Sequence, residues 1–304
     1  MAKNIIITES ELRKIIKEEI IKHISEGIDI NKTGNNRTVS VTNNHQNYVD
    51  TNDSHNPYLF LDTQRGFRTL SIFQRKSTND RMDSNPLLNA LKERKGWKFN
   101  NAKSDLMKLL KNFVAASHLL PKYDTIVLTP SNNKLNEIVF SYLLRLIKHD
   151  YAENKFFSKL EAQDVYEKMI DDDYINSHFE NPSEVWNSID DSFSAMNLPK
   201  SQNGNDGIFS YKFLEKSSYR DAILQSMKIN IRPHSDLNYA EAINGKDVLV
   251  FDDTITTGKT ISDSGKAIAE MFNPKSITFI TLFSALDDAN STQQKVTSLD
   301  EKKL

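Results

Sequence analysis

One segment, Val248–Thr260, constrains the fold more than any other part of the chain, and its sequence is VLVFDDTITTGKT. The apolar run at its start follows a turn at Gly245 and predicts a short strand buried on both faces, as in a parallel sheet. Two adjacent carboxylates, Asp252 and Asp253, come directly after this run. A loop rich in hydroxyl groups and containing Gly258 then leads into a helix. The segment therefore predicts a strand, a loop suited to phosphate and a helix, which are parts of an α/β fold.

Two regions of the chain predict helices and strands in alternation, the pattern of a parallel sheet flanked by helices. The first region has a helix, a strand and a helix at Asp105–Leu120, Asp124–Pro130 and Leu135–Lys148. The second has a strand, a loop, a helix and a strand at Asp247–Phe251, Thr254–Thr260, Asp263–Met271 and Ser276–Ser284. Tyr58–Leu61 and Leu70–Gln74 also predict strands, around a turn at Arg65–Gly66. We expect one α/β domain over residues 58–290, with a polar, helix-prone insertion or hood at about residues 150–207.

The two ends of the chain differ in composition from this domain. Residues 1–27 predict an amphipathic helix, because Thr8 and Glu11 form a capping box and apolar side chains follow at helical spacing. Its apolar stripe either binds a protein partner, such as a second copy of the chain, or packs on its own domain. Residues 28–57 are rich in Asn, Thr and Ser with few apolar side chains, so we expect a disordered polar linker. We also expect a polar, frayed tail over residues 291–304.

The overall composition excludes several classes of protein. The chain has no cysteine, which excludes disulfides, thiolate zinc sites and a cysteine nucleophile. Its net charge of −2 gives no general basic field for nucleic acid. No apolar run approaches the roughly 18 residues that a membrane span requires, and the N-terminal residues do not form a secretory signal. We expect a soluble, cytoplasmic protein without membrane partners.

Two groups of residues contain metal-binding side chains without the spacing of a metal site. His23, His45 and His55 match no pattern of zinc ligands, and a solvated segment explains them better. The acids Asp171–Asp173 are adjacent rather than spaced as ligands. We therefore interpret them as a solvated helix end.

The order of groups in the motif Val248–Thr260 indicates the kind of ligand that it binds. Open α/β sheets bind ligands at the carboxyl ends of their strands, where Asp252 and Asp253 are expected to lie. Two carboxylates buried there need partners, and sugar hydroxyls and a magnesium ion are natural ones. The loop that follows reaches a helix N-terminus, whose amide groups and dipole favour a phosphate. Carboxylates for a diol followed by a phosphate cradle describe a ribose 5-phosphate pocket.

Two other interpretations of this motif fit it less well. Gly258–Thr260 looks like the end of a P-loop, but that motif requires glycine at the position of Asp253. A carboxylate facing the phosphate wrap would repel the ligand. The second alternative is a buried strand followed by a capped helix, with the acids serving only as caps. Two acids, three loop threonines and a glycine in this order exceed what a cap requires.

The sequence VLVFDDTITTGKT resembles the diphosphosugar-binding signature of the type I phosphoribosyltransferases. It departs from that signature at Thr254, where the family usually has an apolar residue. The resemblance implies that Asp252 and Asp253 hold the ribose 2- and 3-hydroxyls. It also implies that Mg²⁺ bridges the diphosphate and the ribose oxygens, with the two acids as indirect metal ligands. The residues implied to wrap the 5-phosphate are Thr256, Thr257, Gly258, Lys259 and Thr260.

The same family binds diphosphate through an earlier loop, which follows its first core strand. The sequence TIVLTPSNNKLNEI takes that place here. The implied diphosphate-binding residues are Thr129, Pro130, Ser131, Asn132, Asn133 and Lys134, with Lys134 as the contact to the anion. Family members also carry a mobile basic loop, for which Tyr211–Arg220 and Arg232–His234 are candidates; a plain surface segment is the alternative for both. The resemblance covers about residues 100–150 and 205–285.

The resemblance implies an activity, and one position narrows its substrate. A phosphoribosyltransferase transfers phosphoribose from phosphoribosyl diphosphate to a nitrogenous base and releases diphosphate, and no side chain needs to act as a nucleophile. Members that salvage oxopurines carry an acid at the position of Thr256, so this specificity is disfavoured. Threonine there is more like the orotate, amidotransferase or competence-associated branches. Without cysteine the chain cannot be a complete amidotransferase, and the acceptor base stays open.

A second hypothesis is a protein that keeps the fold without the catalysis. It would act as a non-catalytic nucleotide sensor or as a structural, virion-associated protein of a bacteriophage. The opening sequence ITESELRKIIKEEI resembles the N-termini of uncharacterised phage proteins, which would place the protein in the cytoplasm of a bacterial host or in the virion. A DNA-binding regulator is disfavoured, because the N-terminal region predicts one helix where a winged-helix reader needs several.

Overall fold

The computed structural model describes most of the chain between residues 27 and 299. The described residues are 27–33, 36–42, 49–52, 54–75, 86–94, 96–131, 134–230, 239–255, 257–284 and 294–299. The amphipathic helix predicted for residues 1–27 therefore lies outside them, except for its last residue. Within this part of the chain, every helix is too short or too polar to span a membrane.

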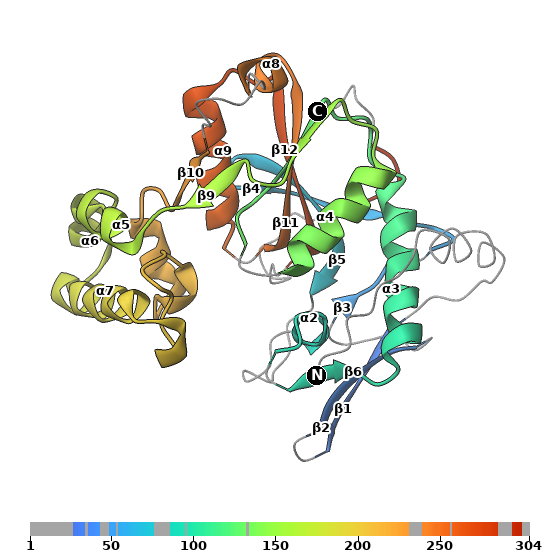
Figure 1. The fold of residues 1–304 in the computed structure, drawn as a ribbon, viewed down its shortest axis with the longest axis horizontal. Helices are drawn as coiled ribbons and strands as arrows, with labels where there is room; N and C mark the ends of the chain where they lie inside the picture. Colours follow the sequence, from blue (N-terminus) through green and yellow to red (C-terminus); the bar gives the residue numbers. More distant parts are fainter. Residues whose placement is uncertain are drawn as a thin grey trace.

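The centre of the structure is a mixed eight-stranded sheet in the order β13-β4-β5-β12-β11-β7-β8, with β3 paired to β5 at one side (Figure 1). Five neighbouring strands are parallel: β5 (Phe67–Arg75), β12 (Ser276–Ser284), β11 (Asp247–Ile255), β7 (Thr125–Leu128) and β8 (Tyr151–Glu153). Three are antiparallel to their partners: β3 (Val49–Asp50), β4 (Leu59–Gln64) and β13 (Gln294–Val296). The structure thus confirms a mixed α/β fold with a central sheet flanked by helices.

The first part of strand β11, residues 248–251, is apolar and buried because helices cover both faces of the sheet there. On one face, Leu249 and Phe251 pack in a core with α3 (Ala102–Ser117) and α4 (Lys134–Leu146). On the other, Val248 and Val250 pack with α8 (Tyr239–Ile243) and α9 (Lys259–Met271). Figure 1 shows the two helix pairs on opposite sides of the sheet.

The strand order contains a switch point beside β11. From β7 the chain passes through α4 to β8 on one side, and it later returns to place β11 on the other side of β7. The two connections leave the sheet in opposite directions, so a crevice forms at the carboxyl ends of β7 and β11. Ligands of open α/β sheets bind in such a crevice.

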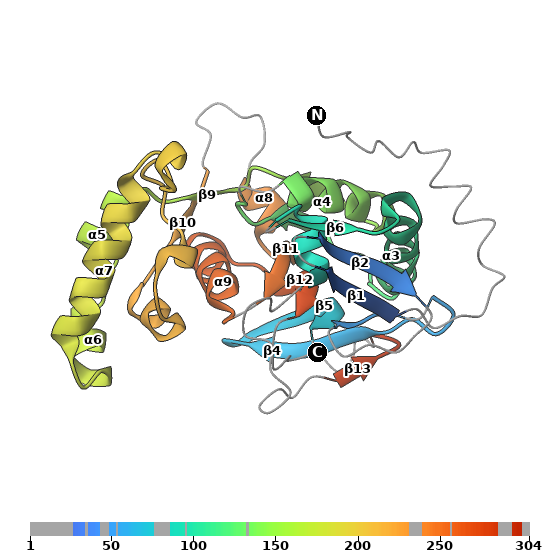
Figure 2. The ribbon, with the colours of Figure 1, turned by 90° about the horizontal axis from the view of Figure 1, so that it is seen from below.

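A helical unit, which we call the hood, lies beyond α9 at one end of the molecule (Figure 2). Its helices are α5 (Ala162–Lys168), α6 (Asp172–His178) and α7 (Pro182–Asn197), followed by the 3-10 turns η1 (Lys200–Gln202), η2 (Tyr211–Phe213) and η3 (Ser217–Ala222). They share a separate apolar core that runs from Leu160 to Ile223, so the unit extends past the expected boundary at residue 207. The antiparallel strands β9 (Phe157–Lys159) and β10 (Met227–Ile229) connect the hood to the sheet domain.

Parts of the region predicted to be a disordered linker, residues 28–57, form strands in the structure. β1 (Gly27–Thr33) and β2 (Asn36–Thr42) make a hairpin, and β2 pairs in parallel with β6 (Trp97–Phe99), close to the short helix α2 (Pro86–Leu91). Val39 and Val41 alternate along β2 and are fully buried. Asn52 is also buried, and its side chain donates to the carbonyl of Ile72 and accepts from the amide of Tyr58.

This difference has a simple physical reason. Composition counts apolar residues, whereas a strand needs them only at alternate positions, and a buried asparagine is tolerated when its amide is hydrogen-bonded. The region expected to be a frayed tail, residues 291–304, likewise contains a short strand, since β13 pairs with β4 at Gln294–Val296.

Candidate functional site

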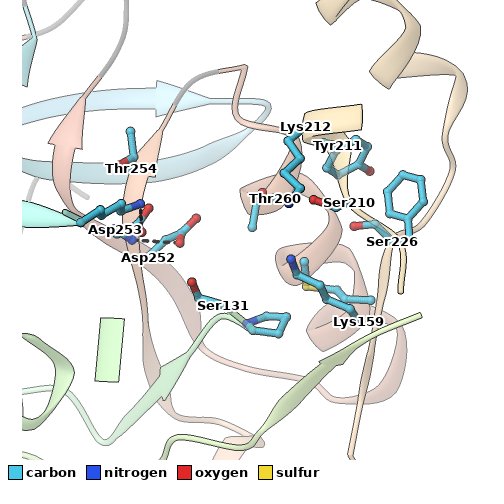
Figure 3. A pocket seen from close by; sticks show the side chains of 14 residues that line it. Ser131, Lys159, Ser210, Tyr211, Lys212, Ser226, Asp252, Asp253, Thr254 and Thr260 are labelled. Atoms are coloured by element: carbon cyan, nitrogen blue, oxygen red, sulfur yellow. Dashed lines mark hydrogen bonds and ion pairs between the residues drawn. The ribbon is translucent and has the colours of Figure 1, made fainter. Parts of the chain in front are cut away.

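A polar cavity of about 210 Å³ lies at the carboxyl ends of β7 and β11, with the hood as its opposite wall. The sheet side contributes Pro130, Ser131 and the two acids of the motif (Figure 3). The hood side and the nearby β9–β10 pair contribute Lys159, Phe209–Lys212, Ser226 and Met227. The cavity therefore has an acidic wall on the sheet and a basic, partly aromatic wall opposite it.

Asp252 is held by residues from three elements. The register of β11 against β7 pairs Phe251 with Leu128, so that Asp252 falls beside Thr129. The Thr129 hydroxyl donates to Asp252 Oδ1 over 2.9 Å, and the Asn136 amide of α4 reaches the same oxygen at 3.4 Å. The amide of Asp253 donates to it as well, over 2.9 Å. These contacts fix the orientation of a side chain that is only 9% exposed.

Asp253 has a cationic partner that sequence reasoning missed. Lys92, which follows α2, forms an ion pair with Asp253 Oδ2 inside the protein. The two residues are 161 positions apart, and nothing in the sequence around Lys92 distinguishes it from a surface lysine. Its charge compensates one of the two buried carboxylates.

The other carboxylate, Asp252, has an unusually high pKa. Burial, followed by the charge of Asp253, raises the pKa of Asp252 from its ordinary value of 3.8 to about 6. The hydrogen bonds from Thr129 and the Asp253 amide oppose this rise, as does the charge of Lys92. The acid pair therefore accommodates one negative charge more easily than two.

This raised pKa predicts a pH dependence of stability. Between pH 4 and pH 6 the unfolded chain ionises Asp252 while the folded protein keeps it protonated, so the folded state loses stability as the pH rises. A rise from 3.8 to about 6 corresponds to up to about 3 kcal/mol. We compare the free energies of unfolding of Asp252→Asn and the wild type at each pH. The variant should gain stability relative to the wild type as the pH rises from 4 to 7, by up to about 3 kcal/mol. Urea unfolding at several pH values measures it, and a difference independent of pH would contradict the assignment.

The loop after β11 forms an open helix N-terminus. Gly258 is the N-cap of α9 at φ +69°, a left-handed conformation that favours glycine, and no side chain caps the helix there. A Cβ at this position would lie 3.3 Å from Gln64 Oε1. Because the first amides of a helix have no partners within it, they can bind an anion. Thr257 and Thr260 flank this site, and Thr256 lies outside the described residues.

The ammonium group of Lys259 is not free to bind a phosphate, because it is paired with an acid. Its Nζ donates to Asp263 Oδ1 over 2.8 Å, and both side chains are buried. Asp263 Oδ2 accepts from the Tyr211 hydroxyl over 2.6 Å and from the Ser226 hydroxyl. Burial, with the neighbouring charge of Asp263, raises the pKa of Tyr211, so this phenol stays protonated and donates. Asp263 therefore links the start of α9, through Lys259, to the hood, through Tyr211.

The residues of the loop after β7 serve two purposes: one supports Asp252, and others line the cavity. Thr129 is buried and its hydroxyl serves Asp252, while Pro130 and Ser131 line the cavity. Lys134 begins α4, but the position of its side chain lies outside the described part of the structure, as do Asn132 and Asn133.

The hood wall carries cations that the sequence motif does not include. Lys159 of β9 points into the cavity (Figure 3). Burial lowers its pKa, the charge of Asp252 opposes this effect, and Lys212 adds to it. Lys212 belongs to the segment Tyr211–Arg220, one of the two candidates for a mobile basic loop, and the structure places it against the site. The other candidate, Arg232–His234, lies outside the described residues.

Arg65 binds both the loop after β11 and the hood. It lies in the turn between β4 and β5 at φ +51°, and its Nε donates to the carbonyl of Thr257 over 2.8 Å. Its second terminal nitrogen binds Asp221 Oδ1 of η3 at 2.5 Å. One guanidinium therefore contacts both the loop and the hood.

In the described part of the chain, no cluster of three or more His, Cys, Asp or Glu side chains is arranged to hold a metal. The acid pair alone offers few oxygen ligands. Such a donor set fits Mg²⁺, which keeps several waters and takes its remaining ligands from phosphate oxygens.

Comparison with known proteins gives one family match. The model of the phosphoribosyl transferase domain matches residues 209–303, which include β11, the phosphate loop, α9 and β12. No curated protein and no solved structure shows a significant match. The motif at Val248–Thr260 lies inside the matched segment, and the resemblance that it predicts is confirmed. The match over residues 209–303 supports a relation of this part of the chain to the phosphoribosyltransferases.

Proposed function

We propose that the protein binds phosphoribosyl diphosphate and transfers its phosphoribose group to a nitrogenous base. The observation that carries this proposal is one cavity system in which two buried acids adjoin an uncapped helix N-terminus. The domain family supports phosphoribosyl transfer in general. The residue roles below are assigned from the geometry of this chain.

In this proposal Asp252 and Asp253 accept hydrogen bonds from the ribose 2- and 3-hydroxyls. Thr129 and Asn136 hold Asp252 in place, while Lys92 holds Asp253. The 5-phosphate then lies against the amides at Gly258–Thr260, with Thr257 beside it. Pro130 and Ser131 border the space left for the diphosphate.

The reaction breaks the bond between ribose carbon 1 and the diphosphate oxygen and forms a bond from carbon 1 to a ring nitrogen. The diphosphate leaves with the bonding electron pair, and the nitrogen loses a proton to water. Positive charge develops on the ribose ring during this displacement, and the nearby carboxylates stabilise it electrostatically. Orientation of the two substrates in a closed pocket provides the rest of the acceleration. No side chain is required as a nucleophile.

Magnesium is the cofactor that this site fits, with Asp252 and Asp253 as indirect ligands. When bound, it would neutralise charge on the leaving diphosphate. The side chains of this chain have separate tasks. Lys159 lines the same cavity as Pro130 and Ser131 and supplies a basic group for the leaving diphosphate.

A panel of bases tests this activity. The protein is incubated with phosphoribosyl diphosphate, Mg²⁺ and single purine, pyrimidine or pyridine bases, and diphosphate release is measured. We expect release that depends on the base for at least one non-oxopurine, because Thr256 cannot act as a base towards a purine nitrogen. Tight ligand binding without release from any base would reject transfer and support the non-catalytic sensor.

A further inference from the structure

A second cavity of about 230 Å³ adjoins the first and contains the phosphate loop. Its walls combine Thr257–Ile261 with three residues of the hood: Tyr211, Lys212 and Arg220. The cradle for the 5-phosphate is therefore built from two parts of the chain. The loop supplies amides and hydroxyls, and the hood supplies cations.

The loop by itself lacks a positive charge for the phosphate. A phosphate ester carries a charge of about −1.5 to −2 at pH 7. The ammonium group of Lys259 is bound to Asp263, and the nearest acids of the motif add negative charge to the region. Compensating charge has to come from outside the motif.

Arg220 carries a buried hydrogen-bond donor without an acceptor in the described part of the chain, as expected for a residue that binds an anion. Its Nε is buried and has no hydrogen-bond partner among the described residues. Burial lowers its pKa, with the neighbouring Tyr211 and Asp221 opposing this effect. A buried guanidinium donor is unfavourable until an acceptor arrives, and a phosphate oxygen is a matching acceptor. The Thr254 hydroxyl, which lines both cavities, is also buried without a partner there.

Lys212 brings a second cation to the same place. It lines both cavities, and Figure 3 shows its side chain extending towards Thr260 at the start of α9. Its Nζ lies 4.8 Å from the centre of the Phe213 ring, and the described residues provide it with no carboxylate partner.

We propose that Lys212 and Arg220 of the hood bind the 5-phosphate group of the ligand and complete the phosphate site. This inference rests on the proposed function and assigns a new part of its ligand site to residues outside the motif. It also predicts ligand preference: a ribose compound without the 5-phosphate leaves these two cations unpaired and binds weakly.

The test compares ligands that do and do not carry the 5-phosphate. Binding of ribose 5-phosphate, phosphoribosyl diphosphate and inorganic pyrophosphate is measured by calorimetry on the full chain with Mg²⁺. The variants are Lys212→Gln, Arg220→Gln and their combination. The control is Lys168→Gln, which removes one charge from an exposed hood lysine that pairs with Asp164. Circular dichroism verifies that each variant is folded, and Lys212→Gln changes a side chain that is exposed to solvent.

We expect the double variant to lose roughly tenfold or more in affinity for ribose 5-phosphate, as for charge-assisted hydrogen bonds. Each single variant should lose part of this affinity. The affinity for pyrophosphate should fall by less than about threefold, and Lys168→Gln should bind ribose 5-phosphate as tightly as the wild type. Equal affinity of the wild type and the double variant for ribose 5-phosphate would overturn the inference and leave the proposed function standing. A wild type that binds none of the sugar phosphates would overturn both.

Discussion

Replacing Asp252 and Asp253 together by asparagine is expected to abolish the thermal stabilisation that phosphoribosyl diphosphate with Mg²⁺ gives the protein. A ligand at 100 times its dissociation constant stabilises the folded state by about 2.7 kcal/mol. For a domain of this size that is a rise of roughly 5 to 10 °C in the melting temperature. Asparagine keeps the volume of each side chain but removes the charge that accepts the sugar hydroxyls. Differential scanning fluorimetry with and without ligand measures the effect.

A second acid pair in the same chain provides the matched control. Asp190 and Asp191 on α7 are exposed and line neither of the two cavities. Changing both to asparagine removes the same two charges and should leave the ligand-induced shift intact. If the variant at Asp252 and Asp253 shifted as much as the wild type, the acids would not be the sugar site.

Replacing Asp263 by alanine is expected to lower the free energy of unfolding by about 3 to 5 kcal/mol. The carboxylate of Asp263 is fully buried and is the partner of Lys259, whose side chain is only 6% exposed. Its removal leaves a buried ammonium group without a counter-charge and two hydroxyls, of Tyr211 and Ser226, without their acceptor. Urea unfolding followed by circular dichroism measures the loss.

The chain contains an exposed pair of the same spacing as a control. Asp164 and Lys168 are also four residues apart on a helix, but both are exposed to solvent. Asp164→Ala should therefore leave the unfolding free energy almost unchanged. Asp263→Asn, which keeps an acceptor oxygen for the hydroxyls, should lie between the wild type and Asp263→Ala. A loss at Asp263→Ala as small as that at Asp164→Ala would contradict the role of this carboxylate.

The parts of the structure that sequence alone predicts are those with strong local patterns. The apolar run before Asp252 gives a strand buried on both faces, and β11 continues through the acids to Ile255. The turn at Arg65–Gly66 joins β4 and β5 as predicted. The helices α3, α4 and α9 fall within a few residues of their expected places. Periodicity and turn residues are properties of short segments, so they are readable without the fold.

The parts that sequence does not predict depend on distant pairings. Lys92 meets Asp253 across 161 residues, and Arg65 meets Thr257 across 192. Lys159 comes from a polar region with no motif. Each is one of many lysines or arginines in the sequence, and only the folded chain selects it. The hairpin β1–β2 was hidden for another reason: two alternating valines are enough to anchor a strand that is otherwise polar.

The central position of β11 has a consequence for the boundaries of the functional unit. The family match begins at residue 209, yet β11 lies between β7 and β12, and β12 lies against β5. Strands β5 and β7 both precede residue 209. A fragment limited to the matched residues would expose two unpaired apolar strand edges, which invite association with other chains. It would also lack Thr129, Lys92 and Arg65. The part of the chain that has to fold together is accordingly longer than the segment that the family model matches.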